Sequence, residues 1–361
     1  MKILHVITSL STGGAEMLVV NLMPMFKKMG HEVGVVVFNG ERTPLMDRLE
    51  RECPECEIYR LGASYYNPWY IMKLVRIMRK YDVVHTHNTA PQLFGAFGSV
   101  LCSVVMRHEN VLVTTEHTTS NRRRGWKWYV CIDRWMYRRY KRVICISNQA
   151  EENLRQYLKR EKFSIQTIFN GVDVESFHNA KAVEAMKSEK FVAVMVAGFR
   201  YQKDQDTLVK AMEKLPKEGY ELWLVGDGDR RKEIETLVRN LNLQDNVKFL
   251  GLRTDVAAIL KTSDVVVMSS HWEGLSLSNI EGMSAGKPFV ASDVDGLREV
   301  TDGHGILFPH EDSGALAEII KRLSEDKEYY QSIANRCYSR AKEFDISEMA
   351  RRYNEVYLEF S

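Results

Sequence analysis

Two glutamates occur in a polar segment that directly follows an apolar run. Glu273 and Glu281 belong to the run H-W-E-G-L-S-L-S-N-I-E at 271–281, which follows an apolar stretch at 265–268. We expect a helix to begin near 276–278, where free backbone amides and the helix dipole favour a phosphate. Glu281 would lie about one turn inside this helix, where a carboxylate can accept hydrogen bonds from vicinal hydroxyls. The segment predicts a sugar-nucleotide site, with two solvated glutamates on an amphipathic helix as the alternative.

A second group of residues could neutralise a leaving diphosphate. An apolar run ends at Gly198, and Arg200 and Lys203 follow in V-A-G-F-R-Y-Q-K-D-Q. Cations at the carboxyl end of a strand would stabilise the charge that develops on a diphosphate. A solvated basic turn is the alternative. Gly13-Gly14 follows the first apolar run and precedes a helical pattern, so that a ligand could approach its backbone closely.

Histidines follow two further apolar runs and would border the same site. His85 and His87 end one run, and His117 follows another. A His-x-His pair can bind a metal ion, but we find no convincing carboxylate or cysteine to complete a centre, so no metal site is predicted. Cys53 and Cys56 have the spacing of a redox motif without a second pair for zinc, and free thiols are expected.

These residues must be positioned by short apolar strands that alternate with amphipathic helices. This alternation of strand and helix patterns stops at N-G-V-D (170–173) and the polar stretch that follows, and it begins again near residue 191. Strands that are apolar on both faces, with helices between them, imply parallel sheets that bind ligands at the carboxyl ends of their strands. Strands are predicted at 3–7, 33–38, 83–87, 111–115, 143–146, 165–169, 191–197, 221–225, 247–250, 265–268 and 288–291.

The chain is longer than a single hydrophobic core usually supports, which is about 250–300 residues. With 361 residues, it is predicted to be an α/β protein of two facing, doubly wound Rossmann-like domains with the ligand in the cleft between them. An acceptor-side domain would span 1–172 and a nucleotide-sugar-binding domain 173–345. Residues 346–361 would form a helix that packs back on the first domain.

Positive charge concentrates in the first half of the chain. Residues 1–180 carry 25 Lys and Arg against 17 Asp and Glu, a net of +8, whereas residues 181–361 carry 25 against 31, a net of −6. Residues 121–142 hold nine basic residues and one acid among three Trp and three Tyr. This composition favours an anionic membrane surface, with a core helix that has a solvated basic face as the alternative. No nucleic-acid partner is predicted, because no recognition module accompanies the patch.

The apolar runs are all too short for a membrane-spanning helix, which needs about 18 or more residues. The N-terminal run contains His5 and is followed at once by G-G-A-E, so a buried first strand fits better than a signal peptide. We therefore expect a cytoplasmic protein, or one that lies on the inner face of the cell membrane.

A series of short motifs runs in order along nearly the whole chain. Together they resemble the motifs of the retaining glycosyltransferases of family four, of the type found in bacterial cell-surface and capsular polysaccharide synthesis, which have the GT-B fold. The most specific is E-G-L-S-L-S-N-I-E-G-M-S-A-G-K-P at 273–288, in which seven residues separate the two glutamates of the family. The others are T-S-L-S-T-G-G-A-E (8–16), G-H-E-V (30–33), V-V-H-T-H-N (83–88), T-T-E-H (114–117), N-G-V-D (170–173), Q-K-D-Q-D-T-L (202–208), L-V-G-D-G (224–228) and V-K-F-L-G (247–251).

The resemblance implies a role for each candidate residue. Glu281 should hold the ribose hydroxyls, Glu273 should contact the donor sugar, and His117 should lie beside that sugar. The loop at 250–253, with Leu250 and Leu252, should flank the base. The family usually has Gly-Arg directly and the lysine five residues later, whereas this chain has G-F-R-Y-Q-K. The residues implied at the diphosphate are Gly14, Gly198, Arg200, Lys203, Leu277 and Ser278.

The resemblance further implies a reaction without a bound metal or other cofactor. A hexose-type sugar would pass, with retention, from a nucleotide sugar, more often UDP-linked, to a lipid-linked or saccharide acceptor. A catalytically silent sugar-nucleotide-binding partner of a biosynthetic complex is the main alternative. A nicotinamide-dependent oxidoreductase is disfavoured, because Arg231 stands where the dinucleotide motif begun at Gly226 needs its third glycine. The pair Asp227 and Asp229 is best explained by a turn that leads into a helix.

Overall fold

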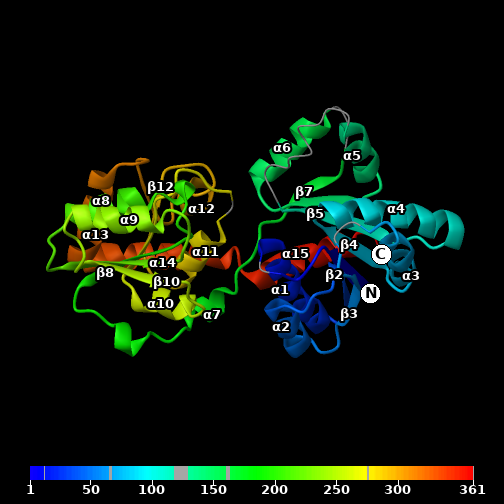
Figure 1. The fold of residues 1–361 in the computed structure, drawn as a ribbon, viewed down its shortest axis with the longest axis horizontal. Coiled ribbons are helices and arrows are strands. Elements are labelled where there is room, and N and C mark those ends of the chain that lie inside the picture. Colours follow the sequence, from blue (N-terminus) through cyan, green and yellow to red (C-terminus); the bar gives the residue numbers. More distant parts are fainter. Residues whose placement is uncertain (12, 65–66, 118–128, 160–162, 275, 361) are drawn as a thin grey trace. The chain divides into compact units, whose positions relative to one another are not determined.

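The computed structural model describes residues 1–361 except 12, 65–66, 118–128, 160–162, 275 and 361. The chain divides into two compact units: Met1–Gly171 with Ile346–Ser361 form unit 1, and Val172–Asp345 form unit 2. Each unit contains a parallel sheet whose strands alternate with helices (Figure 1). The predicted fold class, α/β with two Rossmann-like domains, is therefore confirmed.

Unit 1 is built on a seven-stranded sheet of order β3-β2-β1-β4-β5-β6-β7. The order reverses between β1 and β4, and ligands of such sheets bind outside the carboxyl ends of the strands near this switch. The central strands are almost fully buried, which explains the apolar run of β1, whereas β4 buries polar side chains as well. The strands are β1 (Lys2–Ile7), β2 (Glu32–Asn39), β3 (Glu57–Gly62), β4 (Val83–His87), β5 (Val111–Glu116), β6 (Arg142–Cys145) and β7 (Ile165–Thr167).

Two apolar clusters cover the two faces of this sheet. One cluster joins alternate strand residues to α1, α2 and α15, and the other joins the intervening strand residues to α3, α4, α5 and α6. Helix α15 follows the last residue of unit 2, yet it buries Met349, Tyr353, Val356 and Tyr357 in the first cluster. The helices are α1 (Gly14–Lys28), α2 (Pro44–Glu52), α3 (Tyr70–Met78), α4 (Thr89–Met106), α5 (Tyr129–Tyr137), α6 (Asn148–Leu158) and α15 (Ile346–Leu358).

Unit 2 repeats the plan with a six-stranded sheet of order β10-β9-β8-β11-β12-β13. Helix α8 packs with α9 and α13, and α11 packs with α7 and α14. The strands are β8 (Phe191–Val196), β9 (Tyr220–Val225), β10 (Val247–Gly251), β11 (Val265–Met268), β12 (Phe289–Ser292) and β13 (Ile306–Phe308). The α-helices are α7 (Val174–His178), α8 (Gln205–Glu213), α9 (Arg231–Asn240), α10 (Val256–Thr262), α11 (Leu277–Ser284), α12 (Arg298–Thr301), α13 (Ser313–Glu325) and α14 (Lys327–Lys342), and 3₁₀ turns span Glu184–Met186 and Tyr201–Lys203.

Two edge strands were not among the predicted ones. Strand β3 is mostly exposed or half-buried, and β13 has only three residues. As an edge strand, β3 pairs on one side only and carries charged residues among its apolar ones, whereas β13 is apolar but too short to form a recognisable run. The motifs of interest lie elsewhere, at the carboxyl ends of β1, β4 and β5 in unit 1 and of β8 and β11 in unit 2.

Candidate active site

The carboxylate of Glu273 lies at the centre of a hydrogen-bonded group in unit 2. Its Oε1 accepts from Lys203 Nζ at 2.5 Å and from Ser270 Oγ at 2.7 Å. Its Oε2 accepts from Gln202 Nε2 at 3.3 Å, and the same amide donates to the carbonyl oxygen of Trp272 at 2.9 Å. The structure thus brings together Lys203 and Glu273, two predicted residues from the ends of β8 and β11.

The Lys203–Glu273 pair is largely shielded from water. The lysine side chain is 19% exposed and the glutamate side chain only 7%. Removing one member of a shielded ion pair leaves the other charge uncompensated, so the two side chains hold each other in place. An incoming diphosphate would compete with Glu273 for the lysine, whose charge is already directed toward the carboxyl ends of the strands.

Ser270 and Gln202 are site residues that the sequence reasoning missed. Ser270 is fully buried and comes three residues before Glu273, and Gln202 directly precedes Lys203. Gln202 occurs inside the motif V-A-G-F-R-Y-Q-K-D-Q that was already singled out, and Ser270 directly precedes the run at 271–281. Their polarity was visible in the sequence, but only the loops' packing shows that both donate to one carboxylate.

Arg200 and Gly198 lie next to each other at the end of β8. The Arg200 side chain is exposed, and it has no ion pair with any residue in the described part of the chain. A methyl group placed on Gly198 would lie 3.9 Å from Arg200 Nε and 3.5 Å from the carbonyl oxygen of Asp227, both ordinary contacts. The fold therefore leaves Arg200 available to a ligand, unlike Lys203.

Glu281 lies in α11, one turn after the start of the helix. It has no hydrogen bond or ion pair with any other described residue, and burial raises the pKa of its carboxyl group. A carboxylate that has lost water and gained no protein donor is costly unless a ligand supplies hydroxyl or amide donors. This arrangement suits the predicted role of Glu281 toward two vicinal hydroxyls.

The start of α11 offers backbone amides that its N-cap side chain does not satisfy. The helix begins at Leu277, as expected, and the side chain of its N-cap Ser276 makes no capping hydrogen bond. The amides of Leu277 and Ser278 are in the first turn, where no helical carbonyl can accept from them. Helix starts of this kind attract phosphate through their amides and the helix dipole.

Gly296 supports the backbone of the Glu273 loop. It has φ +83°, and a methyl group there would collide with the carbonyl oxygens of Glu273 and Gly274. We predict that Gly296→Ala lowers the free energy of unfolding by about 2 kcal/mol or more, because strain of the left-handed backbone adds to the collision. Denaturant unfolding measures this loss, and donor turnover should fall with it.

Gly303 provides the matched control for Gly296. It has φ +74°, but a methyl group on it would meet nothing within 4 Å. Gly303→Ala should cost only the backbone strain, about 1 kcal/mol, and should leave turnover near the wild-type value. Equal losses of unfolding free energy in Gly296→Ala and Gly303→Ala would show that the contact of Gly296 with the Glu273 loop does not contribute to stability.

The predicted base-flanking loop follows β10. Leu252 is 81% exposed, whereas Leu250 is half-buried. Two aromatic side chains that were not predicted, Tyr201 and Trp272, are also exposed beside the Lys203–Glu273 pair, with their ring centroids 6.0 Å apart. Exposed apolar side chains of this size are typical of ligand-contacting surfaces.

Gly14 and His117 are the predicted site residues of unit 1. Gly14 is the first residue of α1, and a methyl group on it would meet nothing within 4 Å, so the fold itself does not require glycine there. His117 directly follows β5 and is half-buried. The expectation that His85 and His87 lie at the edge of a cleft is wrong, because α15 covers that face and both side chains are fully buried.

Among the described residues, two groups of side chains could hold a metal ion, each with its ligand atoms within 4.8 Å of one another. The first adds His5 to His85 and His87, a third histidine that only the register of β1 against β4 brings close. The second lies in unit 2 and comprises His271, His310 and Glu311. The absence of a metal centre stays a prediction, whereas the six cysteines are free, as expected.

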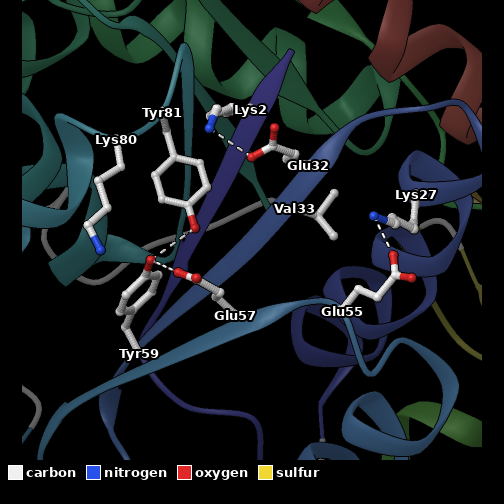
Figure 2. A pocket seen from close by; sticks show the side chains of 9 residues that line it. All are labelled: Lys2, Lys27, Glu32, Val33, Glu55, Glu57, Tyr59, Lys80 and Tyr81. Carbon is white, nitrogen blue, oxygen red and sulfur yellow. Dashed lines mark hydrogen bonds and ion pairs between the residues drawn. The ribbon is translucent and has the colours of Figure 1, made fainter.

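A hollow of about 160 Å³ lies at the opposite, amino-terminal edge of the unit 1 sheet, and Figure 2 shows the side chains that line it. Lys2, Glu32 and Glu57, the first residues of β1, β2 and β3, line it. Its charges already pair with one another, as in Lys2–Glu32 at 2.8 Å and Lys27–Glu55. It lies away from the carboxyl ends of the strands and does not include any predicted site residue.

Two family models match consecutive parts of the chain. Glycosyltransferase Family 4 matches residues 12–176, and Glycosyl transferases group 1 matches residues 176–341. The UDP-Gal:alpha-D-GlcNAc-diphosphoundecaprenol alpha-1,3-galactosyltransferase of Escherichia coli is 26% identical over 310 residues, 80% of this chain and 79% of the relative. The N-acetyl-alpha-D-glucosaminyl L-malate synthase of Bacillus anthracis is 25% identical over 368 residues, 96% of this chain and 94% of the relative.

Solved structures share the fold along its whole length. HepE of Anabaena in complex with UDP has a TM-score of 0.80 and 22% identity, with 100% of both chains covered. A glycosyltransferase from Rickettsia africae has a TM-score of 0.81 and 21% identity, with 99% of this chain and 98% of the other covered. Two Rossmann-like units with these matches define a glycosyltransferase of the GT-B fold. The first half of the chain is a Glycosyltransferase Family 4 domain, and the second half is a Glycosyl transferases group 1 domain.

Proposed function

We propose that this enzyme moves a hexose-type sugar from a UDP-linked donor to a lipid-linked or saccharide acceptor during synthesis of a cell-surface polysaccharide. The donor class is supported by a relative named for UDP-galactose and by HepE, which was crystallised with UDP. A lipid-linked acceptor is supported by the diphosphoundecaprenol in the names of two relatives, from Escherichia coli and Campylobacter jejuni.

The observation that carries the proposal is the arrangement at the carboxyl ends of β8 and β11. Glu281 is a shielded carboxylate without a hydrogen-bond donor among the described residues, and the amides of Leu277 and Ser278 begin the same helix, whose N-cap side chain does not cap it. Lys203 lies beside Glu273 in a neighbouring loop. Carboxylate, amides and cation together match the hydroxyls, phosphates and developing charge of a nucleoside diphosphate sugar.

In this proposal, the protein contributes positioning and charge stabilisation. Glu281 holds the ribose hydroxyls, and Glu273 orients the donor sugar. The α11 amides, Lys203 and Arg200 stabilise the diphosphate as the glycosidic bond breaks. We propose retention of configuration by front-face transfer, in which a donor phosphate oxygen takes the proton of the acceptor hydroxyl and no enzyme side chain forms a covalent intermediate.

A panel of nucleotide sugars tests the proposal. The full-length chain is incubated with each UDP- and GDP-linked hexose and with a polyprenyl-diphosphate saccharide, and nucleotide release and product mass are recorded. A UDP-hexose should be turned over and should transfer its sugar. Tight donor binding without turnover of any donor would instead favour a catalytically silent binding partner.

Turnover should not depend on a divalent cation. We predict that the rate of nucleotide release stays within about twofold after dialysis against EDTA, because Lys203, Arg200 and the α11 amides supply the positive charge that a metal supplies in other enzymes. Restoration of a lost rate by Mg²⁺ or Mn²⁺ would contradict this prediction. Heat-inactivated enzyme in the same buffers corrects for chemical breakdown of the donor.

We further propose that the basic stretch at 121–142 docks on an anionic membrane on the cytoplasmic side. Residues 121–128 lie outside the described residues. In the described part, Asp133 of α5 is buried, and Trp135 packs on the half-exposed ring of Phe97, with ring centroids 4.6 Å apart. No described helix is both long and apolar enough to cross a membrane.

Vesicle sedimentation tests this docking. We predict that vesicles of phosphatidylglycerol bind the chain at low salt and lose it at high salt, because the interaction is electrostatic. The double variant Arg139→Glu and Lys141→Glu should bind about 30-fold more weakly, at roughly 1 kcal/mol for each of the two basic residues removed. Lys214→Glu with Lys217→Glu, on the surface of unit 2, is the matched control. Equal binding by both double variants would contradict the assignment.

A further inference from the structure

A row of buried histidines lies on one face of the unit 1 sheet. His85 and His87 alternate along β4 and therefore point to the same face. The register of β1 places His5 beside His85, and the register of β5 places Thr115 beside His87. All four side chains are fully buried, and His117 follows β5 on the same face.

Hydrogen bonds link three of these rings in line. His5 Nδ1 lies 2.8 Å from His87 Nε2, and His87 Nδ1 lies 2.9 Å from His117 Nε2. The planes of the His5 and His87 rings are only 18° apart, which suits an in-line N–H···N bond. The row ends at His117 Nδ1, a buried atom without a hydrogen-bond partner among the residues that the structure describes.

Tyr357 of α15 joins this row to His85. Its hydroxyl oxygen lies 2.5 Å from His85 Nδ1 and 3.4 Å from His5 Nε2. His85 Nε2 in turn lies 2.8 Å from Thr115 Oγ1. A continuous path thus runs from His85 through the tyrosine hydroxyl, His5 and His87 to His117.

The rings of this path are neutral near physiological pH. Burial lowers the pKa of His5 to about 3 and that of His117 to about 4, and it lowers the pKa values of His85 and His87 well below the ordinary range. A neutral imidazole carries one proton on its two ring nitrogens, so one nitrogen donates and the other accepts. The direction of one bond therefore determines the direction of every other bond along the path.

Only two arrangements of protons satisfy all the links. If the Tyr357 hydroxyl donates to His85, then His5, His87 and His117 all carry their proton on Nε2, and His117 Nδ1 is an acceptor. If the hydroxyl donates to His5 instead, all protons move to Nδ1, and His117 Nδ1 becomes a donor. The 2.5 Å and 3.4 Å distances favour the first arrangement, because the shorter bond suits O–H as the donor.

We propose that the Tyr357 hydroxyl, acting through His5 and His87, holds His117 in the Nε2–H form, so that His117 Nδ1 accepts a hydrogen bond from a hydroxyl of the donor sugar. Tyr357, His5 and His87 are positioning residues in this scheme. The identity of the ligand rests on the proposed function, whereas the proton arrangement does not. In this way, the C-terminal helix α15 determines that His117, at the carboxyl edge of the sheet, accepts a hydrogen bond through Nδ1 rather than donating one.

A metal ion at the three buried histidines fits the geometry less well. The rings of His85 and His87 are 14° from parallel with centroids 4.4 Å apart, so their in-plane lone pairs run side by side. Ligands of a tetrahedral ion must instead converge on one point. The 2.8 Å separation of His5 Nδ1 and His87 Nε2 also matches a hydrogen bond.

Nuclear magnetic resonance of the full-length chain labelled with ¹⁵N-histidine tests the proton arrangement, since the ring nitrogen shifts and couplings distinguish the two tautomers. Single His→Gln variants assign the signals. His5, His87 and His117 should all carry the proton on Nε2. A proton on Nδ1 of any of them, or a shift of the His5, His85 and His87 signals together on adding stoichiometric Zn²⁺, would overturn the proposal.

Tyr357→Phe removes the link, and Tyr353→Phe is its matched control. Both tyrosines are fully buried on α15, but the Tyr353 hydroxyl bonds to Thr115 Oγ1 at 3.2 Å, outside the path from His85 to His117. Tyr357→Phe should leave His117 as a mixture of tautomers, and Tyr353→Phe should not. An unchanged His117 in Tyr357→Phe would overturn the proposal.

Kinetics give a second readout. Tyr357→Phe should raise the KM for the donor sugar about tenfold, the worth of one hydrogen bond, with less effect on kcat. Equal changes in the donor KM of Tyr357→Phe and Tyr353→Phe would overturn the assignment of a donor-sugar hydroxyl as the partner of His117 Nδ1. The tautomer measurement needs no substrate, so a failure of the proposed function, seen as no turnover with any nucleotide sugar, is distinguishable from a failure of this proposal.

Discussion

The Lys203→Ala variant will transfer sugar about 100-fold more slowly than the wild-type chain at saturating donor. Lys203 Nζ is a shielded cation at the carboxyl end of β8, 2.5 Å from Glu273 Oε1. The charge on a leaving diphosphate grows as the glycosidic bond breaks, so loss of this cation should lower kcat more than it raises KM. Steady-state rates of nucleotide release over a range of donor concentrations measure both constants.

Lys214→Ala is the control for this variant. Lys214 is exposed at the end of α8 and lies outside the predicted site. It should keep the wild-type rate. In Lys203→Ala, Glu273 retains Ser270 and Gln202 as donors, so the chain should still fold, which a thermal melt checks. A folded Lys203→Ala variant with a wild-type kcat would refute the proposed role of the lysine.

The Glu281→Gln variant should raise the KM for the donor about 10- to 100-fold, because a neutral amide replaces a charged acceptor of two hydroxyl hydrogen bonds. The same change should make the protein more stable at neutral pH. Burial raises the pKa of this carboxyl, so its charged form is unfavourable in the folded chain until a ligand supplies donors. Loss of function with a gain in stability would distinguish a binding residue from a structural one.

The pH dependence of stability follows from the direction of this pKa shift. Between the unfolded and the folded pKa of Glu281, the folded chain holds more proton than the unfolded chain. The free energy of unfolding therefore falls as pH rises through that window. Below the unfolded pKa, Glu281→Gln and wild type should melt alike, whereas above the folded pKa the variant should melt at the higher temperature. A variant that melts below wild type at neutral pH would contradict this prediction.

Glu318→Gln provides the matched control for Glu281→Gln. Glu318 is an exposed glutamate within α13, and it lies outside the predicted site. Its replacement should change neither the KM nor the difference in melting temperature across pH. The same changes in KM and in melting temperature for Glu281→Gln and Glu318→Gln would mean that the buried environment of Glu281 affects neither donor binding nor stability.

The central strands of both sheets could be predicted from sequence because they are buried on both faces. Strands β1, β4 and β11 are almost entirely apolar or buried along their length, and each was predicted to within one residue of its ends. Burial on two sides forces a continuous apolar run, which is visible in the sequence. Strand β3, which is mostly exposed or half-buried, and β13, which has only three residues, lack such a run and were missed.

The residue types of the candidate site were also visible in the sequence, because Glu273, Glu281 and Lys203 lie in loops and helix starts directly after apolar runs. Topology then implies where they lie, since all strands of a parallel sheet end at one edge. The burial of these side chains and their hydrogen-bond partners were not visible in the sequence. Glu273 is shielded and holds three donors, whereas Glu281 is shielded and holds none among the described residues.

The buried histidines show what only the tertiary structure decided. The H-x-H pattern of His85 and His87 determined that both side chains share one face of a strand, because strand side chains alternate. Whether that face meets solvent or protein depends on α15, whose residues lie more than 250 positions later in the chain. A hydrogen-bonded path needs groups from β1, β4, β5 and α15 at distances of about 3 Å, and such distances are set by packing rather than by local pattern.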